Sequence, residues 1–565
     1  MKHGPPHWEL ALWGALALAS SLLISWPLAA NLGTHTLVGL HNPDVMTSVW
    51  WYDQVADSLR QLQDPFTTER LLYPLGTHIG ANIWNIGAPL AAAPLSWIFG
   101  PVGGLNAAAI AFTALTGALA GFGARRLGAD RWAAGAACVM GASLAFGVVE
   151  VASGRGEQGL LAPILLTLLG WSLLREGPGR RGLAVATGAA LGLCGVVYWM
   201  GGYMVGLVLV ADLAWRAARR RVDRLVLVDL LWMGGATALV ALPFLVPVAI
   251  GTSTGSDHRL LDATQAGGID GAVALPWVLE GPFAPMQVDA SRRWPLLAFP
   301  VLALGAWRLR GAPRWLAVVG LGCAVMALGR QAWLPFLVAG EALALPLPHR
   351  ALDLLPGMDR FWWPYRWSML LLPCAALVLG ALLGSLQSLR WRLPACLLVV
   401  GWSLYEGAAM MRLSPALQPF PMTEVKVPPV FQRLGQQPGQ HPILQFPPEE
   451  VSAGLVHWQV WHEQPIHSSI GWQLPGAIPS SWEPAMREHA LLDTLIFDAP
   501  AKPSWSAEDA GGFHYLVLYT GHGAKGPGAL GYDGWKRRVE AQLGPSAYQD
   551  QQMSIWLMPG APPLP

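Results

Sequence analysis

Long apolar runs separated by arginine-rich turns are the dominant feature of this sequence. A helix needs roughly 20 apolar residues to cross the hydrocarbon core of a bilayer. Eleven runs of about that length begin near Glu9, Gly103, Trp132, Gly159, Gly182, Gly201, Leu225, Trp294, Arg314, Arg366 and Leu393. Only 13% of the 565 residues are charged, whereas soluble proteins carry roughly 25%. The sequence therefore predicts a mainly α-helical, polytopic transmembrane bundle of about eleven spans and excludes an ordinary soluble enzyme.

Net charge and residue usage exclude further classes of function. The formal net charge is +1, so no basic surface indicates a nucleic-acid partner. The 29 tryptophans suit a chain with many membrane–water boundaries, where indole rings prefer to lie. The cysteines lie in apolar stretches and have no metal-binding spacing, which predicts small buried hydrophobic side chains; they are Cys138, Cys194, Cys323, Cys374 and Cys396.

Arginine placement predicts the topology, because positive charge near span ends favours the cytoplasm. The clusters fall at 125–131, 175–181, 216–224, 308–314 and 390–392. All of them face inward if the N-terminus is cytoplasmic and two ambiguous runs, Ala81–Gly100 and Trp333–Leu347, do not cross. Pro89 and Pro94 support a re-entrant or juxtamembrane first run, since proline interrupts a helix. We interpret Leu10–Ala30 as a retained anchor rather than a cleaved signal peptide.

This topology divides the chain into two expected domains. Residues 1–410 form the transmembrane module, with a first external loop at 31–102, and residues 411–565 form an extracytoplasmic domain. Strand-like runs at 442–447, 513–520 and 553–559 alternate with helix-compatible sequence, which predicts an α/β fold for the second domain. We expect a chain that crosses the membrane several times, with its N-terminus inside and its C-terminal domain outside.

The first external loop carries the strongest candidate for chemistry, Asp44. This residue follows a proline and starts an amphipathic helix that we expect at the membrane interface. The apolar positions of the helix are Val45, Val49, Tyr52, Val55, Leu59 and Leu62. Asp44 fits an N-terminal cap, and it also fits a general base or a ligand of a divalent cation. Asp53 and Asp57 fit the solvated face of the same helix.

The same loop continues with a turn that holds two weaker candidates. Pro74 and Gly76 are typical turn residues, and His78 and Asn85 follow them before the re-entrant run. Turn chemistry explains the first two without any function. His78 is a candidate site residue, and Asn85 is a candidate supporting residue.

Charged residues gather at the outer end of the third span. Glu150 ends this apolar run, and Arg155 and Glu157 follow within the segment Ser153–Gly159. A buried acid at this depth is costly unless it is paired or hydrated. Two interpretations follow: Glu150 and Arg155 form a structural pair, or Arg155 and Glu157 line a site with Glu150 in support.

Two arginines flank an aromatic run just outside the tenth span. Arg360 and Arg366 enclose Phe361, Trp362, Trp363 and Tyr365. Guanidinium groups bind phosphate oxygens in a two-point fashion, so a lipid headgroup phosphate is a natural partner. Interfacial anchoring is the alternative, and it fits Arg366 better than Arg360.

Three histidines of the C-terminal tail lie near a glutamate, but the intervals between them match no zinc-binding motif. The segment contains His457, His462, Glu463 and His467. The favoured interpretation is packing of the tail onto the membrane module.

In their order along the chain, these motifs resemble the polytopic membrane glycosyltransferases of the GT-C superfamily, of the bacterial type that uses polyprenyl-phosphate sugars. The matching segments are Asp44 in the first loop, Pro74–Gly76, Gly87–Leu90, Phe99–Pro101 with Asn106, Ala124–Gly128, Gly154–Gln158 with Ala162–Pro163, Arg360–Arg366, and Gln459–Gly471 of the tail. They extend over most of the chain, and each is weak alone.

The resemblance implies a location in the bacterial cytoplasmic membrane and an external active site between the first loop and the bundle. It implies inverting sugar transfer from a polyprenyl-phosphate donor to a glycan, lipid or protein acceptor, with Asp44 as the base. Arg360 and Arg366 match the basic residues that hold the lipid phosphate, and Arg155 and His78 are further candidates for binding the substrate or this phosphate. Some relatives use a metal in this loop, so Mg²⁺ or Mn²⁺ is compatible with the resemblance, and membrane lipids are further expected partners.

Two alternatives remain open at this point. Asp44 has no adjacent second acid, and no lysine lies between Lys2 and Lys426, which favours a non-catalytic relative such as an assembly factor or scaffold. A transporter is the third interpretation, but transporters usually place ionisable residues at mid-membrane, and here the charges lie at span ends.

Overall fold

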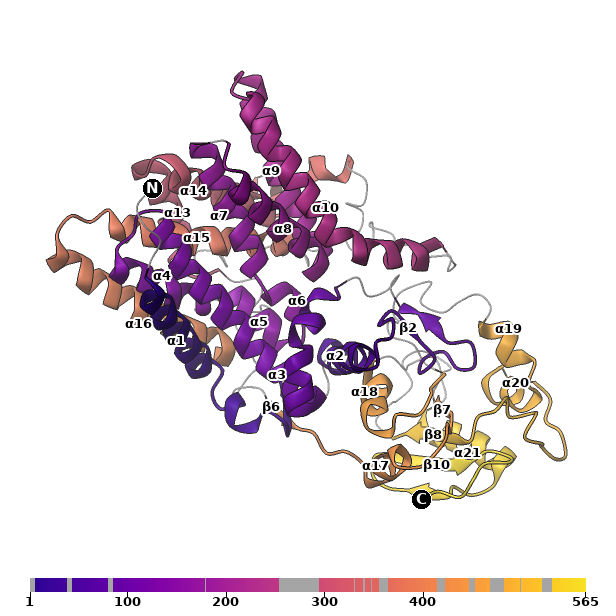
Figure 1. Cartoon of the computed structure of the whole chain (residues 1–565). Helices are drawn as coiled ribbons and strands as arrows, with labels where there is room; N and C mark the ends of the chain where they lie inside the picture. Colours follow the sequence, from indigo (N-terminus) through magenta and orange to yellow (C-terminus); the bar gives the residue numbers. More distant parts are fainter. Residues whose placement is uncertain are drawn as a thin grey trace. The chain divides into compact units, whose positions relative to one another are not determined.

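Figure 1 shows the computed structural model of the chain. The chain forms two compact units. The described residues are 6–37, 43–79, 85–177, 179–253, 294–329, 331–338, 341–346, 348–354, 364–413, 422–446, 453–467, 482–497, 499–520 and 531–565. Unit 1 comprises Met1–Gly39, Trp84–Val246 and Asp262–Thr423, and unit 2 comprises Leu40–Ile83, Pro247–Leu261 and Glu424–Pro565.

Unit 1 is a bundle of apolar helices. Its helices are α1 (His7–Ile24), α3 (Gly87–Arg126), α4 (Arg131–Ala142), α5 (Ala145–Ala152), α6 (Gly156–Gly159), α7 (Ala162–Glu176), α8 (Arg181–Val197), α9 (Trp199–Ala218), α10 (Arg224–Ser253), α13 (Ala298–Arg308), α14 (Gly311–Ala327), α15 (Ser368–Gly384) and α16 (Leu389–Leu413). Short 3-10 helices cover Leu28–Asn31, Pro348–Leu354 and Pro364–Trp367, and two short strands are β1 (His35–Leu37) and β6 (Met422–Glu424).

Every one of the eleven apolar runs contains a helix. Among the described residues, seven helical segments are long and apolar enough to cross a membrane, and α8 and α14 are shorter apolar helices. The mainly α polytopic fold class is therefore confirmed, while the number of eleven crossings stays a prediction. All five cysteines are buried, as expected for small hydrophobic side chains.

The two ambiguous runs have different structures. In the second run, β4 (Gln331–Val338) and β5 (Glu341–Pro346) form an antiparallel pair of strands, which agrees with a run that does not cross as a helix. In the first run, α3 continues through Pro94, and the helical path breaks instead at Gly100, whose φ is +73°. The prediction that proline interrupts this run is therefore wrong in position: the helix breaks at Gly100 instead. Glycine adopts the left-handed conformation found there without steric cost.

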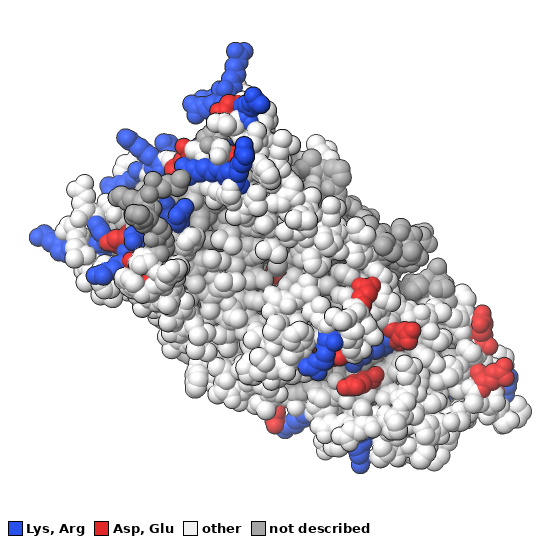
Figure 2. All heavy atoms as spheres, in the orientation of Figure 1, with Lys and Arg blue, Asp and Glu red and all other residues white. Residues whose placement is uncertain are grey.

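Arginine-rich turns lie at one end of unit 1 and are tied together by ion pairs (Figure 2). Arg392 pairs with Asp130, which caps α4, and Arg125 pairs with Glu9 of α1 at 3.0 Å. The N-terminal helix therefore begins at the arginine-rich end of the bundle. This arrangement supports the predicted topology, in which that end faces the cytoplasm.

Unit 2 joins part of the first loop to the C-terminal residues. Its elements are α2 (Pro43–Gln61), β2 (Thr67–Thr68), β3 (Thr77–His78), α17 (Pro429–Gly435), β7 (Ile443–Phe446), α18 (Ala453–His462), α19 (Trp482–Arg487), α20 (Ala490–Phe497), β8 (Tyr515–Tyr519), α21 (Tyr532–Leu543), β9 (Tyr548–Gln549) and β10 (Met553–Leu557). The four-stranded sheet has the order β7-β8-β10-β9, with β7 parallel to β8 and β10 antiparallel to both neighbours.

All three strands expected in the tail are present, as β7, β8 and β10, so the predicted α/β character is confirmed. The core of this unit includes Phe446, Leu516 and Trp556 from the sheet, and Leu72 from the first loop. The domain boundary near residue 410 stays a prediction. The structure adds that residues 40–83 pack with the C-terminal residues in one unit.

Candidate functional site

A buried ion pair lies in the candidate site of unit 1. Glu150 lies on α5 and is fully buried, and its Oε2 lies 2.5 Å from Nε of Arg155. The chain reverses between the two residues through Gly154, whose φ is +81°. The predicted pair is therefore present. A carboxylate at this depth is compatible with folding because the guanidinium offsets much of its desolvation cost.

Arg366 lies in the 3-10 helix just before α15. Its Nη1 donates to Sδ of Met200 at 3.0 Å, and its Cζ lies 5.6 Å from the ring centre of Tyr198. Its Nε is buried and has no hydrogen-bond acceptor among the described residues. A thioether is a weak acceptor, so this guanidinium lacks a strong anionic partner in the described part of the chain.

The structure brings several predicted residues of unit 1 into one electrostatic neighbourhood. Arg366 interacts with the charges of Glu150 and Arg155 as well as with the nearby hydroxyls of Tyr198 and Tyr365. Glu157 is close enough to act on Tyr198. These residues come from the α5–α6 segment, the α8–α9 junction and the segment before α15, so three separated parts of the sequence converge.

Tyr198 and Met200 are members of this group that the sequence did not single out. Tyr198 interrupts the helical path between α8 and α9, and its hydroxyl donates to Sδ of Met200 at 3.1 Å. The same sulfur thus accepts from both Tyr198 and Arg366. An aromatic residue in an apolar run gives no sequence signal of a polar role, and only the helix break indicates it.

Asn85 precedes α3, whose first turn packs closely on the same junction. A Cβ at Gly87 would lie 2.8 Å from Cα of Val197, so only glycine permits this approach. The start of α3 therefore lies against the α8–α9 junction, one residue before Tyr198. Asn85 stays a candidate supporting residue on this basis.

Asp44 and His78 belong to unit 2. Asp44 is exposed and lies in the first turn of α2, where a carboxylate also complements the helix dipole. His78 is half-buried on β3, and its ring stacks on Phe66 with the ring centres 6.0 Å apart. Their catalytic and phosphate-binding roles stay predictions.

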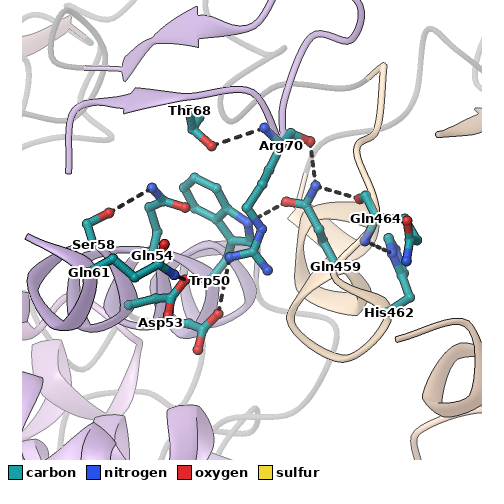
Figure 3. Close-up of polar contacts among 11 residues, drawn as sticks. Trp50, Asp53, Gln54, Ser58, Gln61, Thr68, Arg70, Gln459, His462 and Gln464 are labelled. Carbon is teal, nitrogen blue, oxygen red and sulfur yellow. Dashed lines mark hydrogen bonds and ion pairs between the residues drawn. The ribbon is translucent and has the colours of Figure 1, made fainter. Parts of the chain in front are cut away.

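Asp53, expected on a solvated face, is instead half-buried beside a cation (Figure 3). Its carboxylate lies 3.7 Å from Nη1 of Arg70, and the two side chains are 24% and 21% exposed. Burial raises the pKa of Asp53 to about 6, against the opposing effect of Arg70. Asp57 remains on the outer part of the helix and accepts a hydrogen bond from Gln61 at 2.8 Å.

The tail histidines are core residues. His457, His462 and His467 are fully buried, and burial lowers the pKa of each to about 3. Nδ1 of His462 accepts from the backbone N–H of Gln464, and Nδ1 of His467 accepts from that of Gln445, both at 3.1 Å. These are neutral imidazoles packed inside unit 2.

No metal-ligand cluster is present in the described ranges: no three His, Cys, Asp or Glu side chains there are placed to hold an ion. Arg360, Phe361, Trp362 and Trp363 lie outside the described residues, whereas Tyr365 is described. Of the predicted phosphate-binding arginines, Arg366 and Arg155 lie among the described residues, and Arg360 does not.

Comparisons with known proteins agree with this architecture. Residues 96–253 match the family model of dolichyl-phosphate-mannose-protein mannosyltransferases. A comparison of the sequence with curated proteins found no significant match. The fold is similar to that of the arabinofuranosyltransferase AftD from Mycobacteria, with a TM-score of 0.59 and 16% identity over 99% of this chain. The chain spans 40% of the length of AftD.

Two further solved structures share the fold. ArnT from Cupriavidus metallidurans bound to undecaprenyl phosphate has a TM-score of 0.53 and 12% identity, covering 96% of this chain and 98% of ArnT. The oligosaccharyltransferase of Archaeoglobus fulgidus has a TM-score of 0.52 and 12% identity, covering 91% of this chain and 70% of that enzyme. The resemblance in the sequence is confirmed: the chain is a multi-pass membrane protein with the fold of the GT-C superfamily of glycosyltransferases.

Proposed function

We propose that this protein is a membrane glycosyltransferase that takes its sugar from a polyprenyl-phosphate donor. The observation that carries the proposal is Arg366, whose buried Nε has no acceptor among the described residues. A buried donor without a partner is costly, and a ligand oxygen would satisfy it. The structure of ArnT with undecaprenyl phosphate, a protein of the same fold, supports a lipid phosphate as that ligand.

Arg366 and Tyr198 would hold the phosphate together. Both now donate to the thioether of Met200, and a phosphate oxygen is a much stronger acceptor than sulfur. Arg366 and Tyr198 would therefore release the sulfur of Met200 and donate their hydrogen bonds to the phosphate of the lipid-linked sugar. Arg155 adds positive charge nearby, but Glu150 partly neutralises it, which makes Arg366 the principal phosphate ligand of this group.

Asp44 would act as the general base in an inverting transfer. The acceptor oxygen attacks the anomeric carbon as the bond from that carbon to the phosphate oxygen breaks. The electron pair of that bond leaves with the polyprenyl phosphate, whose growing negative charge Arg366 stabilises. The proton of the acceptor hydroxyl passes to the Asp44 carboxylate. No step of this scheme passes through a metal ion.

The reaction would take place on the outer face of a bacterial cytoplasmic membrane. The arginine-rich turns would face the cytoplasm, and the Arg366 group comes from the opposite ends of the helices. The acceptor would be a hydroxyl of a glycan, a lipid or a protein outside the cell.

The test uses the purified full chain in lipid vesicles with a panel of undecaprenyl-phosphate-linked hexoses and pentoses. Arg366→Gln should weaken donor binding by about tenfold or more, the effect of losing a charged hydrogen bond. Asp44→Asn should abolish transfer and leave donor binding unchanged. The matched control is Arg314→Gln, because Arg314 is an exposed arginine in the first turn of α14. Unchanged donor binding in Arg366→Gln, or retained transfer in Asp44→Asn, would overturn the corresponding assignment.

A further inference from the structure

We propose that the C-terminal residues of unit 2 position the helix that carries Asp44, and that Gln459 is the positioning residue through which they do so. This inference rests on the proposed role of Asp44. It gives the C-terminal residues of unit 2 a role in positioning Asp44.

The first observation is the packing of α2 within unit 2. The apolar face of this helix is buried at Val45, Val49, Tyr52 and Val55, and the helix packs against α18. An amphipathic helix at a membrane surface would leave this face to the lipid. Protein side chains therefore cover a face that the sequence alone assigns equally well to a bilayer.

The second observation is that Gln459 of α18 is fully buried and uses both ends of its amide (Figure 3). Its Oε1 accepts from Nε1 of Trp50 on α2 at 2.6 Å. Its Nε2 donates to the carbonyl oxygens of Arg70 and Gln464. One side chain thus connects α2, the loop that follows α2, and the turn after α18.

Backbone hydrogen bonds fix the same loop to the C-terminal sheet. The N–H of Ile466 donates to the carbonyl of Arg70 at 2.9 Å, and the N–H of Tyr73 donates to the carbonyl of Ile466 at 3.0 Å. The neighbouring Pro465 accepts from the N–H of Ile443, the first residue of β7, at 2.8 Å. A continuous hydrogen-bonded path therefore links the sheet to the first loop.

These polar contacts fix the position of α2 on α18, which apolar packing alone does not fix. Hydrophobic contact is non-directional, so α2 can rotate or slide on α18 at modest cost. The Trp50–Gln459 hydrogen bond fixes both the rotation and the axial position of the helix. Asp44 lies six residues before Trp50, about 9 Å along the axis at the usual helical rise, so a shift at Trp50 moves the carboxylate.

The test is Gln459→Met in the full chain, with Gln445→Met as the matched control. Both glutamines are fully buried in unit 2, but Gln445 lies on β7 and its Nε2 faces the hydroxyl of Tyr519 at 3.5 Å. The control therefore removes a buried amide from the same unit without touching the first loop. Methionine keeps a similar volume in both variants.

Hydrogen exchange of residues 43–61 is the first readout. Exchange in Gln459→Met should be about tenfold faster than in the native chain, as local opening rises when a buried hydrogen bond is lost. Gln445→Met should leave exchange in this segment unchanged. Equal exchange of 43–61 in both variants and the native chain would overturn the coupling, whether or not the protein is a glycosyltransferase.

Kinetics with the lipid-linked donor are the second readout. In Gln459→Met the kcat should fall by about tenfold while the KM for the donor stays within about twofold, because orientation is lost and the phosphate contacts remain. Faster exchange with an unchanged kcat would overturn the positioning role. If Asp44→Asn is also active, the proposed function fails at Asp44, and the exchange result still decides the coupling.

Discussion

Arg366 donates to the sulfur of Met200 at 3.0 Å, a contact between a permanent cation and one of the weakest acceptors in proteins. The hydroxyl of Tyr198 approaches the same sulfur at 3.1 Å. Met200 therefore occupies the place where two donors converge. An anion that reached this point would replace the sulfur, and a carboxylate built into the chain there would compete with it.

Substitution of Met200 tests this arrangement. Met200→Glu should raise the KM for a polyprenyl-phosphate donor by about tenfold or more, because an internal carboxylate would pair with Arg366. Met200→Leu removes only the weak acceptor and should leave the KM within about twofold. Initial rates of transfer at varied donor concentration measure both KM values, and donor binding to the vesicle-reconstituted protein measures the affinities. Equal donor affinity in the two variants would contradict a phosphate site at Arg366.

The Glu150–Arg155 pair makes a prediction about stability. Glu150 is fully buried, and loss of one partner leaves the other charge without its counter-ion, which costs about 3–5 kcal/mol. Both Glu150→Gln and Arg155→Met should therefore lower the thermal midpoint in detergent. The double variant should recover part of the loss, because no isolated charge remains. Additive losses in the double variant would show that the two side chains are energetically independent.

Close helix packing at Gly188 predicts a sharp contrast between two glycines. A Cβ at Gly188 of α8 would collide with the carbonyl oxygen of Met233 on α10, whereas a Cβ at Gly234 would meet nothing within 4 Å. Gly188→Ala should destabilise unit 1 by about 1–3 kcal/mol through overpacking. Gly234→Ala should be neutral or slightly stabilising, since alanine favours a helix. Thermal unfolding in one detergent compares the two variants, and similar midpoints would contradict the close approach of α8 to α10.

The sequence predicted the helices and the tail strands because each of these elements leaves a local pattern. It also identified Glu150, Arg155 and Arg366, since charges at the ends of apolar runs are conspicuous. Tyr198 had no such signal, because an aromatic residue near a membrane boundary is ordinary. Its proposed role depends on the helix break at Tyr198 and on the contact with Sδ of Met200, neither of which leaves a pattern in the sequence.

Long-range pairing was also beyond the reach of the sequence. Trp50 and Gln459 are 409 positions apart, and each is ordinary in its own helix. The apolar stripe of α2 predicted a buried face but not its partner, because lipid and protein surfaces select the same pattern. Asp53 was misplaced for a related reason: a polar residue on the helix edge becomes half-buried once Arg70 folds beside it.

Acid should destabilise unit 2 because its core contains neutral imidazoles. Burial holds the pKa of His457, His462 and His467 near 3, against an ordinary value of 6.5. The unfolded chain therefore binds more protons below about pH 6.5, so this stability is present above that pH and is lost as the pH falls toward 3. Each imidazole contributes about 1.4 kcal/mol per pH unit, or about 4 kcal/mol for the three.

Asp53 acts in the opposite direction and sets the net slope. Its pKa is raised from 3.8 to about 6, so the folded state binds the extra proton, and its contribution is present below pH 3.8 and lost as the pH rises through 6. Between pH 6 and 4 the net loss should be about 3 kcal/mol per pH unit on acidification. Hydrogen exchange of the β8 amides, corrected for intrinsic pH dependence, measures it. His457→Phe should reduce this slope by about 1.4 kcal/mol per pH unit, the contribution of one proton. An unchanged slope in that variant would show that this imidazole does not remain neutral in the core.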